Sequence, residues 1–446
     1  MRKISVVFAF IALTVFSCTK DRMPSLIELD NQLRNLVASA SPNGQADFYI
    51  LPSESDLDKI PQDPNNPLTE AKVNLGKFMF YDTGLATNPM RPSGLGTYSC
   101  ASCHIPEAGF KPGTFQGIAD GGVGFGINGE NRLMNSEYEE DELDVQDARA
   151  LSLVNVAYVT NTFWNGMFGA TGVNEGTEAL WDQNESTMLN HRGLQGIETQ
   201  NLEGLEVHRI EITKPVLEEN GYIEMFDEAF ADIPEEERYT TETASFAFSA
   251  YIRTIISNRA PFQNWLKGNI DALDYNEKKG AILFFSKANC STCHYNENLG
   301  SPEFHALGVN DMYQQPSYST HEGDFRNEGR AAFTQLEEDL YKFKVPGIYN
   351  NADSDFFFHG ASVKTLDDLI EYKNNGVREN MDVPESQMSI KFKPLGLTDE
   401  EKLHLKAFIK TGLSDPNLIR YQPTSVPSES CFPNADIQSI IDLGCD

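Results

Sequence analysis

The chain has 446 residues, more than one hydrophobic core usually organises, so we expect two domains of about 150–200 residues each. Hydrophobic residues make up 40% and charged residues 23% of the sequence, with 28 Phe and 16 Tyr, which excludes a disordered or collagen-like chain. The 66 Asp and Glu against 35 Lys and Arg give a formal net charge of −31. We therefore expect no nucleic-acid partner, because this surface repels phosphate backbones; a neutral or basic protein partner and simple solubility both fit the charge.

The N-terminus has the pattern of an export signal. Arg2 and Lys3 precede the apolar stretch Ile4–Phe16, which is too short to span a bilayer comfortably but suits a signal peptide. Cys18 follows Val15-Phe16-Ser17 and resembles the cleavage site of a bacterial lipoprotein, with simple secretion as the alternative. No later segment approaches 18 continuous apolar residues. We predict a periplasmic protein that contacts a membrane only through a lipid anchor.

Several segments have helix signatures. Residues 75–80 form an apolar helical turn, and residues 243–256 have helical spacing and are expected to join the two domains. Asp274 with Glu277, and Thr398 with Glu401, have the spacing of capping boxes that open two further helices. Residues 113–147 are Gly-rich and then acidic, and we expect a long mobile loop with a solvated acidic face.

One short motif occurs twice, as Cys100-Ala-Ser-Cys103-His104 and as Cys290-Ser-Thr-Cys293-His294. In C-x-x-C-H, the two thiols form thioether bonds to one haem, and the next residue, His, is held at the iron as its proximal ligand. A redox dithiol does not need the adjacent His, and a zinc site needs its ligand pairs closer together. The sequence therefore predicts two covalent haem c groups, with the His104 and His294 side chains as proximal ligands.

The remaining cysteines, Cys431 and Cys445, predict a disulfide in an oxidising compartment, with two free thiols as the alternative. The predicted fold is mainly α, with two cytochrome c-like domains that each carry one covalent haem and are joined by a helical linker. The predicted boundaries are 1–18 for the signal peptide, 19–67 for an N-terminal extension, 68–240 and 241–420 for the two domains, and 421–446 for a disulfide-closed tail.

The chain resembles the bacterial di-haem cytochrome c peroxidase superfamily, which includes the methylamine-utilisation (MauG) proteins, over about residues 70–415. The segments that carry the resemblance are Leu75–Asp82, Ser99–His104, Gly109-Phe110, Leu153–Asn155, Phe163–Gly166, Phe343–Pro346, Phe358–Gly360, Thr365-Leu366 and Phe392–Thr398. By this resemblance each domain is a cytochrome c fold, and the N-terminal haem is the one that reacts with peroxide.

The resemblance implies an enzyme that reduces hydrogen peroxide to water with electrons from a small c-type cytochrome or a cupredoxin. Electrons would enter at the C-terminal haem and pass Trp164, while Gln200 and Glu206 would line the peroxide site, with Glu203 as a rival acid–base group. Two alternatives are a MauG-like oxidase that modifies a protein or organic substrate, and a non-catalytic di-haem electron carrier. The resemblance is also compatible with a homodimer.

The sixth iron ligands depart from the family pattern. Relatives cap the peroxide-reactive iron with a loop His, but this chain has no His between Ile105 and Phe163, so we expect an open iron in the oxidised protein. Met134 or Lys111 could cap it instead. At the second haem the family uses a Met or Tyr about 14 residues after Phe-His-Gly. That count lands on Lys373, and the candidates are Tyr372, Met381 and Met388.

Calcium is a further cofactor that the resemblance leaves open. In the family, an Asn at a fixed interval before the Trp helps to bind the ion, but the matching residue here is Arg149, which cannot ligate a cation. Backbone oxygens near Asp353–Asp355 could still contribute to such a site.

Overall fold

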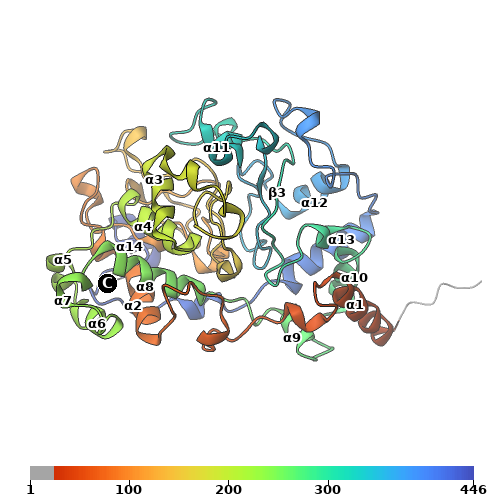
Figure 1. Ribbon diagram of the computed structural model, residues 1–446, viewed down its shortest axis with the longest axis horizontal. Coiled ribbons are helices and arrows are strands. Elements are labelled where there is room, and N and C mark those ends of the chain that lie inside the picture. The colour runs from red at the N-terminus through yellow and green to blue at the C-terminus, as the bar shows by residue number, and fades with distance from the viewer. Residues whose placement is uncertain (1–24, 446) are drawn as a thin grey trace, which may run out of the picture.

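Helices dominate the computed structural model, which describes residues 25–445 (Figure 1). The predicted mainly helical fold is confirmed. The predicted signal peptide and Cys18 lie outside the described residues. Among residues 25–445, none of the helices combines the length and the apolar composition needed to cross a membrane.

The α-helices are α1 (Leu26–Ala40), α2 (Glu70–Tyr81), α3 (Glu185–Met188), α4 (Gly196–Val207), α5 (Lys214–Glu219), α6 (Ile223–Ala229), α7 (Glu235–Arg238), α8 (Thr241–Arg253), α9 (Pro261–Leu266), α10 (Tyr275–Phe284), α11 (Ala331–Thr334), α12 (Leu366–Asn375), α13 (Asp399–Ala407) and α14 (Ile437–Leu443). The strands are β1 (Gly122–Val123), β2 (Leu133–Met134), β3 (Phe304–His305) and β4 (Phe343–Lys344). Each of the two sheets is an antiparallel pair, with Gly122 opposite Met134 and Phe304 opposite Lys344.

Helices α2 and α8 cross in backbone contact. The Thr69 side chain caps α2, and Leu75, Met79, Phe80 and Tyr81 of α2 are buried. At the crossing stands Gly76, where a Cβ atom would lie 1.9 Å from the carbonyl oxygen of Ala247. Only a glycine therefore lets these two helices approach so closely. Phe80, one turn after Gly76, packs beside His104 with ring centroids 6.4 Å apart.

Helices α10 and α13 repeat this arrangement in the second half of the chain. Both predicted capping boxes are present, Asp274 with Glu277 and Thr398 with Glu401. A Cβ atom at Gly280 would lie 1.9 Å from the carbonyl oxygen of His404. Phe284, again one turn later, packs beside His294 with ring centroids 6.4 Å apart. The chain thus contains two copies of one supersecondary unit, each built around a C-x-x-C-H motif.

The packing of α8 bears on the domain boundaries. Instead of running between the two halves, α8 packs on α2 and α4, on the side of the molecule that carries the first motif (Figure 1). The domain boundaries, including the one at residue 240, stay predictions.

Each end of the chain packs on the opposite half. At the N-terminal end, α1 lies against α10. Asp30 of α1 accepts a hydrogen bond from the indole of Trp265 and forms an ion pair with Lys278, both at 2.9 Å. The C-terminal tail returns to the first half, where Ser99 donates a hydrogen bond to the carbonyl of Pro433 at 2.9 Å. The predicted disulfide between Cys431 and Cys445 is present and closes this tail around α14.

Residues 113–147 do not form the expected loose loop. They include β1 and β2, and the buried Arg132 side chain donates to the carbonyl of Ala119 at 2.8 Å and pairs with Asp436 of the tail at 3.2 Å. Tyr138, inside the acidic run, is buried and donates to Asp120 at 2.6 Å. The expectation failed because glycine content and surface charge do not reveal a buried arginine that gathers the carbonyls of the loop.

Gly76→Ala should destabilise the protein by about 1–3 kcal/mol, because the added methyl group forces two helix backbones apart. Gly204→Ala is the matched control. It also lies within a helix, but its Cβ would meet only the His208 ring, at an ordinary 3.7 Å. Thermal unfolding followed by circular dichroism measures both changes. Equal melting temperatures for the two variants would contradict the backbone crossing.

Candidate functional site

The first C-x-x-C-H motif is a 3-10 turn, Cys100–Ser102, followed by a firmly oriented histidine. His104 Nδ1 lies 2.9 Å from the carbonyl oxygen of Phe110 and therefore donates to it. Burial lowers the pKa of His104 to about 4, so the ring is neutral. The Nε2 lone pair is then available to a metal, as for histidine ligands whose other nitrogen donates a hydrogen bond.

The thiols of this motif are free and lie beside an unusually close backbone. Burial raises the pKa of both Cys100 and Cys103 to about 12, so both are neutral thiols. A Cβ atom on Gly117 would lie 2.6 Å from Cys103 Sγ. Glycine at this position keeps the space beside the thiol clear, as a bulky group attached to the sulfur requires.

The second motif has the same local structure. Cys290–Thr292 form a 3-10 turn, and His294 Nδ1 donates to the carbonyl of Leu299 at 2.7 Å. Burial lowers the pKa of His294 to about 4 and raises the pKa of Cys290 to about 12. Both motifs therefore present two thiols and an oriented, neutral imidazole, and the residues present fit a covalent haem at each.

A buried cation also fits haem, which carries two propionates. Lys344 is only 6% exposed and lies over the Phe304 ring at 4.6 Å. Burial lowers its pKa to about 7, and no carboxylate among residues 25–445 pairs with it. An unpaired buried charge is costly, so an anionic group beside Lys344 would stabilise it.

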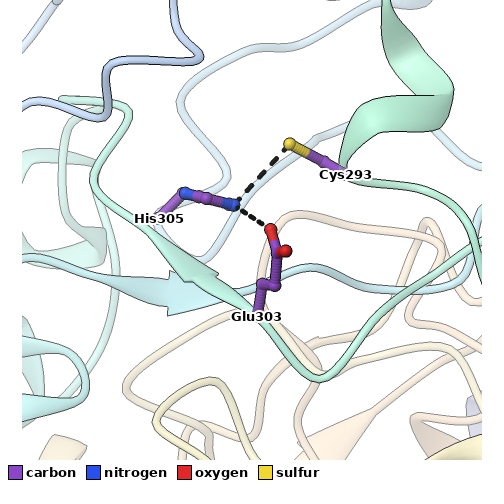
Figure 2. A group of neighbouring side chains, drawn as sticks. All are labelled: Cys293, Glu303 and His305. Atoms are coloured by element: carbon purple, nitrogen blue, oxygen red, sulfur yellow. Dashed lines mark hydrogen bonds and ion pairs between the residues drawn. The ribbon is translucent and has the colours of Figure 1, made fainter.

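Figure 2 shows a second group of potential metal ligands, Cys293, Glu303 and His305. His305 Nε2 lies 2.7 Å from Glu303 Oε2 and 3.6 Å from Cys293 Sγ. A thioether at Cys293 removes its thiolate, and Glu303 already pairs with Lys391 at 2.6 Å. We therefore assign this group to the surroundings of the second motif; the sequence analysis named Cys293 but neither Glu303 nor His305.

The predicted site residues on α4 differ in their surroundings. Gln200 is half-buried, whereas Glu206 is exposed and its carboxylate has no hydrogen-bond partner among residues 25–445. Glu203, the rival, accepts a hydrogen bond from Ser186 at 2.5 Å. Gln200 lies within α4, and the half-buried His208 is the C-cap residue directly after the helix.

The sequence analysis missed an ion pair beside the first motif. His208 Nδ1 lies 2.9 Å from a carboxylate oxygen of Asp144, whose side chain is 5% exposed. Burial alone would lower the pKa of His208, but the charge and hydrogen bond of Asp144 hold it above its usual value. His208 is close enough to lower the pKa of His104, and Asp144 close enough to raise those of Cys100 and Cys103. The pairing joins residues 64 positions apart, so no local pattern could have revealed it.

Trp164 lies where the two halves meet. The indole Nε1 of Trp164 donates to the carbonyl of Arg149 at 2.7 Å. The carbonyl of Trp164 accepts a hydrogen bond from the backbone N–H of Lys344 at 2.8 Å. Its ring meets that of His359 edge-on, with centroids 6.2 Å apart. His359 in turn stacks on Phe343. This position suits the predicted role between two haems, which itself stays a prediction.

The guanidinium of Arg149 occupies the region near Asp353–Asp355 in which the sequence analysis left a calcium site open. It is buried and donates to the carbonyl of Pro112 at 3.0 Å, the carbonyl of Asp355 at 2.9 Å and the hydroxyl of Ser354 at 3.0 Å, and also to the carbonyl of Thr114. These are the oxygens that a calcium ion would need. The residues present therefore do not fit calcium here, because a side-chain cation already satisfies the acceptors.

The candidates for the sixth ligand at the second haem differ in their surroundings. Tyr372 donates to the carbonyl of Leu307 at 2.6 Å, Met381 is 71% exposed, and Met388 Sδ lies against Gly308. Lys373 lies near the motif, because its charge acts on both thiols and on His294. Burial lowers the pKa of Lys373 to about 8.

Comparisons with known proteins agree with this geometry. The family described as di-haem cytochrome c peroxidase matches residues 70–271. The chain is 27% identical over 407 residues to the cytochrome-c peroxidase IdrP1 of Denitromonas iodatirespirans, covering 86% of this chain and 92% of that protein. It is 24% identical over 362 residues to the methylamine utilization protein MauG of Methylorubrum extorquens, covering 81% of this chain and 84% of that one.

A solved structure supports the fold. The crystal structure of a MauG-like protein associated with microbial copper homeostasis superposes with a TM-score of 0.58 at 24% sequence identity. It covers 83% of this chain and 95% of that chain. The shared fold therefore extends over both C-x-x-C-H units.

Arg149→Met should lower the free energy of unfolding by about 1–3 kcal/mol for each buried acceptor left without a donor. A chelator such as EDTA should leave the melting temperature of the unaltered protein unchanged. The control Arg192→Met removes an arginine that is 53% exposed and should change stability by less than about 0.5 kcal/mol. If EDTA destabilised the protein and added calcium restored its stability, the guanidinium of Arg149 would not be taking the place of a calcium ion.

Proposed function

Because the chain belongs to the di-haem cytochrome c peroxidase/MauG family, we propose that it is a di-haem peroxidase that reduces hydrogen peroxide to water. It carries two covalent haem c groups, at Cys100/Cys103 and Cys290/Cys293, with His104 and His294 as proximal ligands. The electron donor is a small c-type cytochrome or a cupredoxin. The protein is exported to the periplasm and is anchored through Cys18.

The observation that carries this proposal is the His208–Asp144 pair beside the first motif. Peroxide cleavage needs one group that removes a proton from the first oxygen and delivers it to the second. Asp144 binds Nδ1 of His208 at 2.9 Å, which leaves Nε2 as the acid–base atom and stabilises the imidazolium that forms. A histidine oriented by a buried carboxylate performs the same task in other enzymes.

The residues of the first site act together. Haem, when bound, supplies electron transfer to the peroxide. His208 moves the proton, Gln200 of α4 offers an amide that orients the peroxide, and His104 holds the proximal side. Each turnover consumes two electrons and two protons and yields two waters.

Electrons reach this site from the second motif past Trp164. The indole lies between segments of both halves and contacts His359 edge-on, which supports a short path through protein. The MauG-like alternative would gain support from a tyrosine ligand at the second haem. The hydroxyl of Tyr372, however, is already bonded to the carbonyl of Leu307, so we favour the peroxidase.

His208→Gln should slow peroxide reduction about 10²–10⁴-fold, because the protein loses the side chain that transfers the proton. The spectra of both haems should not change. Asp144→Asn should slow it by less. Glu206→Gln should stay within about threefold of the unaltered protein, since a group that takes no part in the proton transfer contributes nothing to it. Steady-state turnover with a reduced c-type cytochrome measures all three.

The surface pair His191–Asp182 provides a matched control, because it has the same chemistry at an exposed position. The side chain of His191 is 47% exposed. His191→Gln should leave turnover unchanged. Full activity of His208→Gln would move the role to Glu206 or Glu203. An unaltered protein that carries both haems but reduces no peroxide would refute the peroxidase itself.

The oxidised protein should bind cyanide without prior reduction and show a high-spin ferric signal from the iron held by His104. The sequence has no capping His between residues 105 and 163, and Lys111 Nζ is held by the carbonyl and amide oxygens of Asn351 at 2.6 and 2.9 Å. Met134 packs against an apolar cluster with Ile118. Electron paramagnetic resonance with and without cyanide measures this. A low-spin iron that becomes high-spin in His208→Gln would make His208 a ligand instead of an acid–base group.

A further inference from the structure

We propose that the side-chain amine of Lys373 is the sixth ligand of the iron held by His294. This inference rests on haem attachment at Cys290 and Cys293, which is part of the proposed function, but it does not depend on peroxidase activity. It assigns the distal side of the second haem to a residue type different from the Tyr and Met candidates that the sequence analysis named.

The backbone places Lys373 at the right element. Helix α12 begins after its cap Thr365 and ends at Asn375, and it packs on α13, the helix that crosses α10 just before the second motif. The Lys373 amine lies over two aromatic rings, with Nζ 5.3 Å from the centre of Phe358 and 5.5 Å from the centre of Phe392. These two cation–π contacts favour one position of the amine at the end of its long side chain.

In this position the amine lies near the second motif. The Lys373 charge acts on the Cys290 and Cys293 thiols and on the His294 imidazole. A haem bonded to those thiols and ligated by that imidazole has its iron in the same small region. The amine is therefore close to the cofactor.

The amine has no other partner to explain its position. No hydrogen-bond acceptor or carboxylate among residues 25–445 bonds to Lys373 Nζ. Neighbouring lysines behave differently: Lys402 pairs with Glu371 at 2.7 Å, and Lys406 with Asp367 at 2.5 Å. The half-buried Lys373 amine lies over two aromatic rings without a counter-charge, and a ligand that meets the nitrogen would offset the cost of its partial desolvation.

The other candidates are committed elsewhere. The Tyr372 hydroxyl donates to the carbonyl of Leu307 at 2.6 Å, and its ring stacks on Phe392. Met381 is 71% exposed. Met388 packs on Gly308, where a Cβ atom would lie 3.0 Å from its sulfur.

An amine ligand has consequences for the cofactor. The nitrogen binds iron after releasing its proton to solvent, as any protonated metal ligand must. A nitrogen donor on both sides gives a six-coordinate low-spin iron that is closed to peroxide. Because an axial Met raises the reduction potential of a haem, a Lys in its place keeps the potential lower. The second haem would then be an electron-transfer site.

The test replaces Lys373 in the haem-loaded protein and follows ligation spectroscopically. Lys373→Met should give the near-infrared charge-transfer band of a thioether ligand and a higher reduction potential, while Lys373→Ala should convert one haem from low spin to high spin. Electron paramagnetic resonance, magnetic circular dichroism and a redox titration measure these changes. Lys364→Met, at an exposed lysine just before α12, and Tyr372→Phe should leave all three unchanged.

Mass spectrometry of the Cys290/Cys293 peptide separates the possible failures. Haem present with the unaltered spectrum in both Lys373 variants would overturn the ligand while leaving the peroxidase in place. Loss of the low-spin signal in Tyr372→Phe instead of Lys373→Ala would assign the site to tyrosine. A peptide without haem would overturn the two-haem scheme and this ligand with it.

Discussion

The architecture depends on two helix crossings at which only glycine fits. At Gly76 and at Gly280 a methyl group would lie 1.9 Å from a carbonyl oxygen of the partner helix. Because the helices meet backbone to backbone, the phenylalanine one turn later is brought to the same place in both units, beside the motif histidine. Only glycine is accepted at these two positions, because a densely packed interior has no room for an added atom.

The junction between the units depends on buried polar contacts. Arg149 gathers carbonyls from both halves, Lys111 reaches across to Asn351, and the indole of Trp164 is held by the carbonyl of Arg149. Buried donors and acceptors of this kind are expensive to leave unpaired, so together they define one relative arrangement of the halves. A tryptophan held in this way is suited to a path between two redox centres because its distance to each stays constant.

Two nearly identical motifs receive different surroundings. Each has neutral thiols, a neutral imidazole and a carbonyl that orients the ring. Beside the first stand His208 and Asp144, groups that move protons; beside the second stands Lys373, a group that can occupy the iron. In the function proposed above, the same cofactor would react at one site and transfer electrons at the other, because the protein controls ligation and proton supply while the haem supplies the redox chemistry.

The sequence by itself determined the features that short patterns encode: the mainly helical fold, both capping boxes, the tail disulfide, and the family membership that follows from the motifs and their flanking segments. It could not reveal the partners of His208 or Arg149, nor that the Glu206 carboxylate has none among residues 25–445. Asp144 is 64 residues from His208, and Asp355 is 206 residues from Arg149. The packing of residues 113–147 was misjudged for the same reason, and the calcium site could only be left open. Only the folded chain brings distant acceptors around a buried cation or imidazole, and it is that environment, not the residue type, that decides which charged group serves the site.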